Sequence, residues 1–161
     1  MCTTLLVHVG KRDALDVLPD IVHTLAAKSG LMASFESKDM EPHRSLLKSD
    51  LNIEGGIDFV MSVGGIGDCS CDVVRDIQEA STSVPPTTPR FIRFVRDLHK
   101  AISTAPLVVL FSEDDPPKFV QKEGVLAAFE EAVMQHYGWH TKEELKAWVY
   151  DMNMAFTIQG A

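Results

Sequence analysis

The sequence lacks any long hydrophobic run. Across its 161 residues no apolar stretch approaches the roughly 20 residues that a membrane-spanning helix needs. The opening segment, MCTTLLVHVGKRD, has too short an apolar stretch for a signal peptide, and its basic residues follow that stretch instead of preceding it. We therefore expect a cytoplasmic protein without membrane spans, in which this segment forms the first strand.

Cysteine is also scarce. The chain has three cysteines, and Cys69 and Cys71 are separated by a single residue. An odd number of thiols at this spacing excludes a disulfide framework. The spacing fits neither the usual pairs of structural zinc ligands nor the redox pairs, which have two residues between the thiols. We interpret these residues as inert thiols and predict no metal and no cofactor.

Acidic residues outnumber basic ones. Lys and Arg together number 15 against 23 Asp and Glu, which gives a formal net charge of −8. Binding to nucleic acid needs clustered Lys and Arg to neutralise phosphates, so this balance argues against direct nucleic-acid binding. The acidic surplus is compatible with solubility alone or with attraction to a basic partner.

The composition itself is that of an ordinary globular protein. Hydrophobic residues make up 45% and charged residues 24% of the chain, and its length is typical of one domain. No internal repeat or long linker interrupts the sequence; the clearest break is the proline-rich segment STSVPPTTP at residues 81–89. We therefore treat residues 1–161 as one domain with one hydrophobic core.

Hydrophobic periodicity predicts alternating strands and helices. Strands are expected at residues 3–9, 31–37, 57–63, 106–111 and 152–159, the last of them at a sheet edge. Helices are expected at residues 16–29 and 90–102, with Asp16 and Thr88 as their N-caps, and at 125–137 and 141–149. A further helix should turn Val73, Val74 and Ile77 inward, and a short one should follow Pro42. This order indicates an α/β fold, a single layered domain with a mixed, mostly buried sheet of about five strands covered by helices. Its core should contain Phe94, Leu98, Leu107, Val109, Phe111 and Phe129.

A glycine-rich loop, Gly64–Asp68, follows one predicted strand and precedes a predicted helix. Backbone N–H groups at such a position can hold a phosphate. The spacing of Gly64, Gly65 and Gly67 matches neither the dinucleotide fingerprint nor the phosphate-loop pattern. Asp68 also places a negative charge where a phosphate would lie. The sequence favours a plain strand-to-helix turn, and a nucleotide or phosphate site is the alternative.

An acidic cluster follows the most apolar strand. Glu113, Asp114 and Asp115 come directly after PLVVLF, and ligand sites in α/β sheets lie at the carboxyl ends of strands. Carboxylates that converge there can hold Mg²⁺. The competing interpretation is a solvated acidic loop before the next helix. No second carboxylate motif fixes a metal, so the sequence favours the acidic loop.

One helix carries a basic stripe. Arg90, Arg93, Arg96 and Lys100 recur at helical spacing, opposite the apolar face of the helix at residues 90–102. Such stripes are mostly solvated faces, here paired with the protein's own carboxylates. A surface that binds phosphate or carboxylate groups is the sharper alternative.

Two functional hypotheses remain, because no catalytic motif such as Gly-x-Ser-x-Gly occurs. The favoured one is an acidic protein-binding module, most specifically a bacterial immunity or antitoxin protein that neutralises a basic toxin by charge-complementary docking. The alternative is a small enzyme or nucleotide-binding protein that uses Gly64–Asp68 and Glu113–Asp115. Under the first hypothesis, the partner-binding residues combine acidic side chains with aromatic anchors: Glu113, Asp114, Asp115, Glu130, Glu131, Tyr137 and Trp139.

Overall fold

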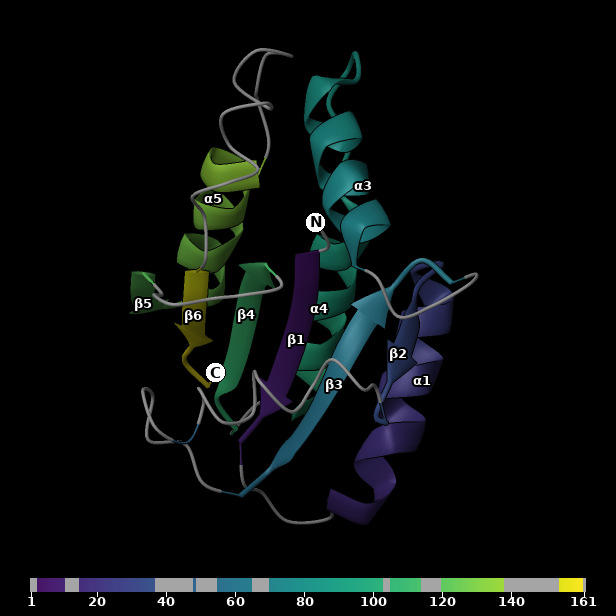
Figure 1. Cartoon of the computed structure of the whole chain (residues 1–161), viewed down its shortest axis with the longest axis vertical. Coiled ribbons are helices and arrows are strands. Elements are labelled where there is room, and N and C mark those ends of the chain that lie inside the picture. Colours follow the sequence, from purple (N-terminus) through teal and green to yellow (C-terminus); the bar gives the residue numbers. More distant parts are fainter. Residues whose placement is uncertain are drawn as a thin grey trace.

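The fold is built on one six-stranded sheet with the strand order β2-β3-β1-β4-β6-β5 (Figure 1). The computed structural model describes residues 3–10, 15–36, 48, 55–64, 70–102, 105–113, 120–137 and 154–160. The strands are β1 (Thr3–Val9), β2 (Met32–Ser34), β3 (Ile57–Ser62), β4 (Leu107–Glu113), β5 (Val120–Gly124) and β6 (Met154–Ile158). The helices described are η1 (Leu15–Val17), α1 (Leu18–Lys28), α3 (Cys71–Thr82), α4 (Arg90–Ile102) and α5 (Leu126–Tyr137).

The sheet is mixed, as the sequence predicts. Neighbouring strands run antiparallel except β5 and β6, which are parallel. The sixth strand, β5, is absent from the predicted set, and β6 lies between β4 and β5 instead of at the edge predicted for it. An edge strand such as β5, with exposed side chains, carries little of the apolar alternation by which strands are recognised in a sequence.

The core lies between the sheet and the helices. Leu107–Phe111 is fully buried in the middle of the sheet, as its continuous apolar run predicts. The ring of Phe91 on α4 packs edge-on against Phe111 of β4 at 5.9 Å and against Phe129 of α5 at 6.4 Å. The predicted core is confirmed, since all six residues named for it belong to one buried cluster.

The described helices cover one face of the sheet, and Figure 1 shows them behind it. The helix α4 contacts α1, α3 and α5. The position of α3 is fixed by the buried Ser70, whose hydroxyl accepts a hydrogen bond from the N–H of Leu5 at 2.9 Å and donates one to the carbonyl of Met61 at 2.5 Å. Ser70 therefore holds the start of α3 against β1 and β3.

The opposite face of the sheet is also buried. Its apolar cluster consists of Leu6, Val60, Val108, Leu110 and Ala155. Both faces of the central strands are therefore withdrawn from water, as expected for a mostly buried sheet. Among the described residues, no helix has the length and apolar character needed to cross a membrane.

Helix boundaries differ from the predictions at three points. The α-helix α1 begins after Val17, with the short η1 before it, so Asp16 is not its N-cap. The helix α3 continues to Thr82, into the segment expected to be a loop. The first N–H of α4 donates to the carboxylate of Asp76, so the cap predicted for Thr88 is supplied by a residue of α3. The helix predicted at 141–149 falls outside the described residues, and of the helix predicted after Pro42 only Lys48 is described, in a helical conformation.

Candidate functional site

Two of the four residues of the basic stripe, Arg90 and Arg96, are engaged in ion pairs within the protein. Arg90 lies 3.4 Å from a carboxylate oxygen of Asp76 on α3, and the guanidinium of Arg96 donates to Glu130 on α5. A third pair reaches the remaining neighbour of α4, because Lys28 of α1 lies 3.7 Å from Asp97. Ion pairs therefore connect α4 to each helix beside it. For Arg90 and Arg96 this supports the interpretation of the stripe as a face that pairs with the protein's own carboxylates, whereas Arg93 and Lys100 are exposed and have no ion pair with a described residue.

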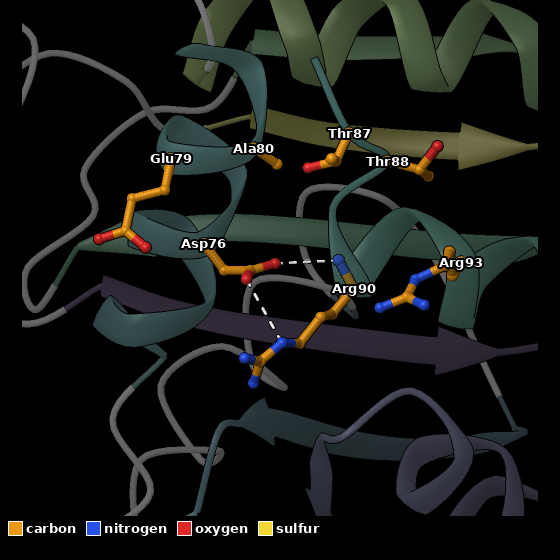
Figure 2. A pocket seen from close by; sticks show the side chains of 7 residues that line it. All are labelled: Asp76, Glu79, Ala80, Thr87, Thr88, Arg90 and Arg93. Atoms are coloured by element: carbon orange, nitrogen blue, oxygen red, sulfur yellow. Dashed lines mark hydrogen bonds and ion pairs between the residues drawn. The ribbon is translucent and has the colours of Figure 1, made fainter. Parts of the chain in front are cut away.

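A pocket of about 600 Å³ lies where α3 ends and α4 begins (Figure 2). Thr87 and Thr88 line it together with Arg90, Arg93, Asp76 and Glu79. Arginines, hydroxyl groups and the first turn of a helix are groups that bind anions. The pocket is therefore the place in the described structure where a phosphate-binding site should be sought.

The carboxylate of Asp76 already occupies the anion position of this pocket. One of its oxygens accepts the N–H of Arg90 at 2.9 Å, and the other faces the guanidinium of the same residue. Figure 2 shows both interactions as dashed lines. A phosphate bound to the N–H and guanidinium of Arg90 would have to displace this internal carboxylate, since both need the same donors. The geometry therefore assigns Asp76 and Arg90 to the docking of α3 on α4.

A buried histidine–aspartate pair lies on the other face of the sheet, and the sequence did not indicate it. His8 of β1 and Asp58 of β3 are register partners, and Nδ1 of His8 donates to the carboxylate of Asp58. The side chain of His8 is 5% exposed, and its Nε2 has no hydrogen-bond partner in the described part of the chain. The sequence signal was a polar residue next to one end of each of two apolar strands.

The His8–Asp58 pair resembles a general base and its orienting carboxylate, but it is closed off from substrates. A Cβ on Gly56 would lie 2.9 Å from Nε2 of His8, so the backbone of Gly56 covers the ring nitrogen. A base that acts on a substrate must reach the proton it removes. The pair in this arrangement therefore links β1 to β3.

The acidic side of α5 meets the edge strand β5 at a corner that we call the β5–α5 corner, formed by residues 121–135. Glu123 and Glu131 are exposed there, and Glu131 accepts a hydrogen bond from the amide of Gln135 at 3.2 Å. Val125 between the two elements is 58% exposed, unlike most large apolar side chains described. A pocket of about 360 Å³ beside it has Ala128, Ala132 and Phe156 among its lining residues.

The predicted partner-binding residues divide into three groups. Glu131 is exposed and free of any ion pair with described residues, whereas Glu130 is held by Arg96. Glu113 ends β4 and Tyr137 ends α5, and for these two residues the structure describes the backbone only. Asp114, Asp115 and Trp139 lie outside the described residues altogether, as do Gly65–Cys69.

Of the other predicted site residues, Gly64 follows β3 with φ +96°, which suits the predicted turn. Cys71 is the first residue of α3 and is partly exposed. Within the ranges described, no three His, Cys, Asp or Glu side chains gather closely enough to hold a metal ion. Comparison of the chain with protein-family models, curated proteins and solved structures gives no match.

Proposed function

We propose that this protein is an acidic protein-binding module. In its most specific form it is an immunity or antitoxin protein that neutralises a basic toxin by charge-complementary docking. The observation that carries the proposal is the β5–α5 corner, where exposed carboxylates flank an exposed apolar side chain. Apolar contacts surrounded by charged groups are typical of protein interfaces, in which the charges speed association and select the partner.

The distribution of ion pairs supports this proposal. Arg90, Arg96 and Lys28 each lie beside a carboxylate of a neighbouring helix. Their positive charge is therefore compensated locally and offers little attraction to an acidic partner. The chain as a whole retains a formal net charge of −8, and Glu123 and Glu131 have no ion-pair partner among the described residues. At the β5–α5 corner the charge left for an external partner is therefore negative, whereas on α4 Arg93 and Lys100 are exposed and have no ion pair with a described residue.

The first experiment isolates the partner. The tagged protein is incubated at low salt with an extract of its source cell, and bound proteins are eluted by raising the salt concentration. Electrostatic steering weakens as the Debye length falls from about 10 Å at 0.1 M to about 3 Å at 1 M salt. The proposal requires a basic protein in the eluate that rebinds in purified form. Recovery of no basic protein at all would overturn it.

The second experiment measures the association rate of the purified pair by stopped flow at several salt concentrations. Glu131→Gln should slow association at low salt by up to about fivefold, because an exposed charge pair contributes about 0.2–1 kcal/mol. Glu36→Gln is the matched control, since Glu36 is an exposed glutamate after β2, at the opposite end of the sheet. Equal rates for the parent and both variants at every salt concentration would contradict docking at the β5–α5 corner.

A further inference from the structure

Among the described residues, β5 ends the sheet, and the backbone groups on its outer side have no partner there. Its neighbour in the described sheet is β6, and the carbonyl of Gly124 accepts the N–H of Gln159 at 2.9 Å. Backbone groups of successive strand residues point to opposite sides, so those of Lys122 face β6 like those of Gly124. The N–H and C=O groups of Gln121 and Glu123 therefore point away from the sheet. Both residues are exposed.

Such an edge pairs readily with another extended chain. The side chains beside it describe what that chain should carry. Val125 and Ala128 are exposed and offer an apolar contact, while Glu123 and Glu131 supply negative charge. Lys122, the basic residue that lines the pocket at the β5–α5 corner, already interacts with another group of the protein.

We propose that the β5 edge binds an extended basic segment of the partner protein, which joins the sheet as an added strand. The backbone of the segment pairs with Gln121 and Glu123, its Lys or Arg side chains on the α5 side meet Glu131, and an apolar side chain covers Val125. This inference rests on the proposed function and specifies how the partner docks. Alternation of basic and apolar residues in the segment follows from the alternation of strand side chains between two faces.

A second copy of the same chain is the less suitable occupant of this edge. A symmetric dimer places the same patch of each subunit against its counterpart. Pairing of β5 with β5 would bring the acidic rims of two corners together, and like charges across paired strands are destabilising. A basic segment from a different protein meets complementary charge.

The test uses the full-length protein and a short peptide in which Val and Lys alternate, capped at both ends. One control peptide has Glu in place of every Lys. A second control keeps the side chains of the Lys peptide but carries N-methyl groups along one backbone edge, which removes the donors needed for strand addition. Binding is measured by fluorescence polarisation, and hydrogen exchange is followed at the amides of Gln121 and Glu123.

We expect the Lys peptide to bind and to slow exchange at both amides severalfold, whereas the N-methylated and Glu peptides bind weakly or not at all. Gln121→Pro removes an outward N–H without removing a hydrogen bond to β6, because proline is tolerated where the N–H faces solvent. It should abolish binding of the Lys peptide. Gln121→Ala keeps the N–H group and should bind like the parent. Circular dichroism and thermal melting establish that each variant is folded, and the exchange result on the parent does not depend on them.

The outcomes separate the two proposals. Equal binding of the N-methylated and Lys peptides, or unchanged exchange at Gln121 and Glu123, would overturn strand addition while leaving acidic docking intact. Equal binding of the Glu and Lys peptides would contradict the charge complementarity on which the proposed function depends. A chain that dimerises on its own with slowed exchange at the same two amides would identify a second copy as the occupant and would also overturn the inference.

Discussion

Replacement of Gly56 by alanine should destabilise the protein strongly, through two separate effects. Gly56 precedes β3 with φ +85°, in the left-handed region that is unfavourable for residues with a Cβ. An added Cβ would overlap the carbonyl oxygen of Val9 and lie 2.9 Å from Nε2 of His8. The backbone oxygen of a central strand cannot move aside as the end of a flexible side chain can. The substitution should therefore push β3 away from β1.

Gly30 provides a matched control for the backbone effect. It follows α1 with φ +71°, but an added Cβ there would lie 3.7 Å from the nearest atom of Arg90, an ordinary contact. The left-handed conformation costs a residue with a Cβ about 1–2 kcal/mol. Gly30→Ala should therefore lower the free energy of unfolding by about 1–2 kcal/mol. Overpacking adds about 1–3 kcal/mol. Because both effects act at Gly56, Gly56→Ala should lower the free energy of unfolding by about 2–5 kcal/mol.

The assay is equilibrium denaturation by urea of the parent and both variants, with thermal melting as a second measurement. In a protein of this size each 1 kcal/mol lowers Tm by about 2–4 °C. Gly56→Ala should therefore lower Tm by several degrees more than Gly30→Ala does. If both variants lost the same free energy of unfolding, the close approach of Gly56 to β1 would be refuted, and with it the closure over His8.

Three further predictions concern the core, the helix junction and metal ions. Phe94→Ala and Phe129→Ala should each lower the free energy of unfolding by about 3–5 kcal/mol, because both rings are fully buried, and unchanged denaturation midpoints would contradict the core described. Asp76→Ala should cost about 0.5–2 kcal/mol through loss of the α4 cap, whereas Asp76→Asn keeps an acceptor and should cost less; equal losses in thermal melts would rule out the cap. Calorimetry with Mg²⁺, Mn²⁺ and Zn²⁺ should show no site tighter than about millimolar, roughly −4 kcal/mol, and a micromolar site lost in Asp114→Asn would favour the enzyme hypothesis.

The buried elements of this fold could be predicted because burial leaves a pattern in the sequence. Val73, Val74 and Ile77 repeat at helical spacing and lie on the buried side of α3, and Leu107–Phe111 is apolar throughout because both its faces are covered. The sequence of β5 shows no such apolar pattern, so this strand was not predicted. Gln121 and Glu123 are exposed at the edge, so neither needs to be apolar. Its strand conformation depends on β6, which is more than 25 residues away in the chain.

Interactions between distant residues set the limit for the candidate site. Glu130 and Glu131 are neighbours with the same side chain, but only Glu130 meets Arg96, 34 residues away. No local pattern distinguishes an acid held by an internal cation from one left for a partner. The same holds for His8 and Asp58, 50 residues apart, which meet only because β1 and β3 pair in one register.

The position of β6 affects the order in which the protein can be completed on the ribosome. This strand follows β4 and β5 in the chain but lies between them in the sheet. Both strands therefore emerge from the ribosome before β6, the strand that joins them. Until β6 has been synthesised, the apolar edge of β4 has no neighbouring strand on that side. Exposed strand edges of this kind favour aggregation and recruit chaperones. A nascent chain that ends before Met154 has no β6 on which β5 can align. The proposed docking edge therefore forms only once synthesis has passed residues 154–158, and a shorter chain would not bind the partner in this way.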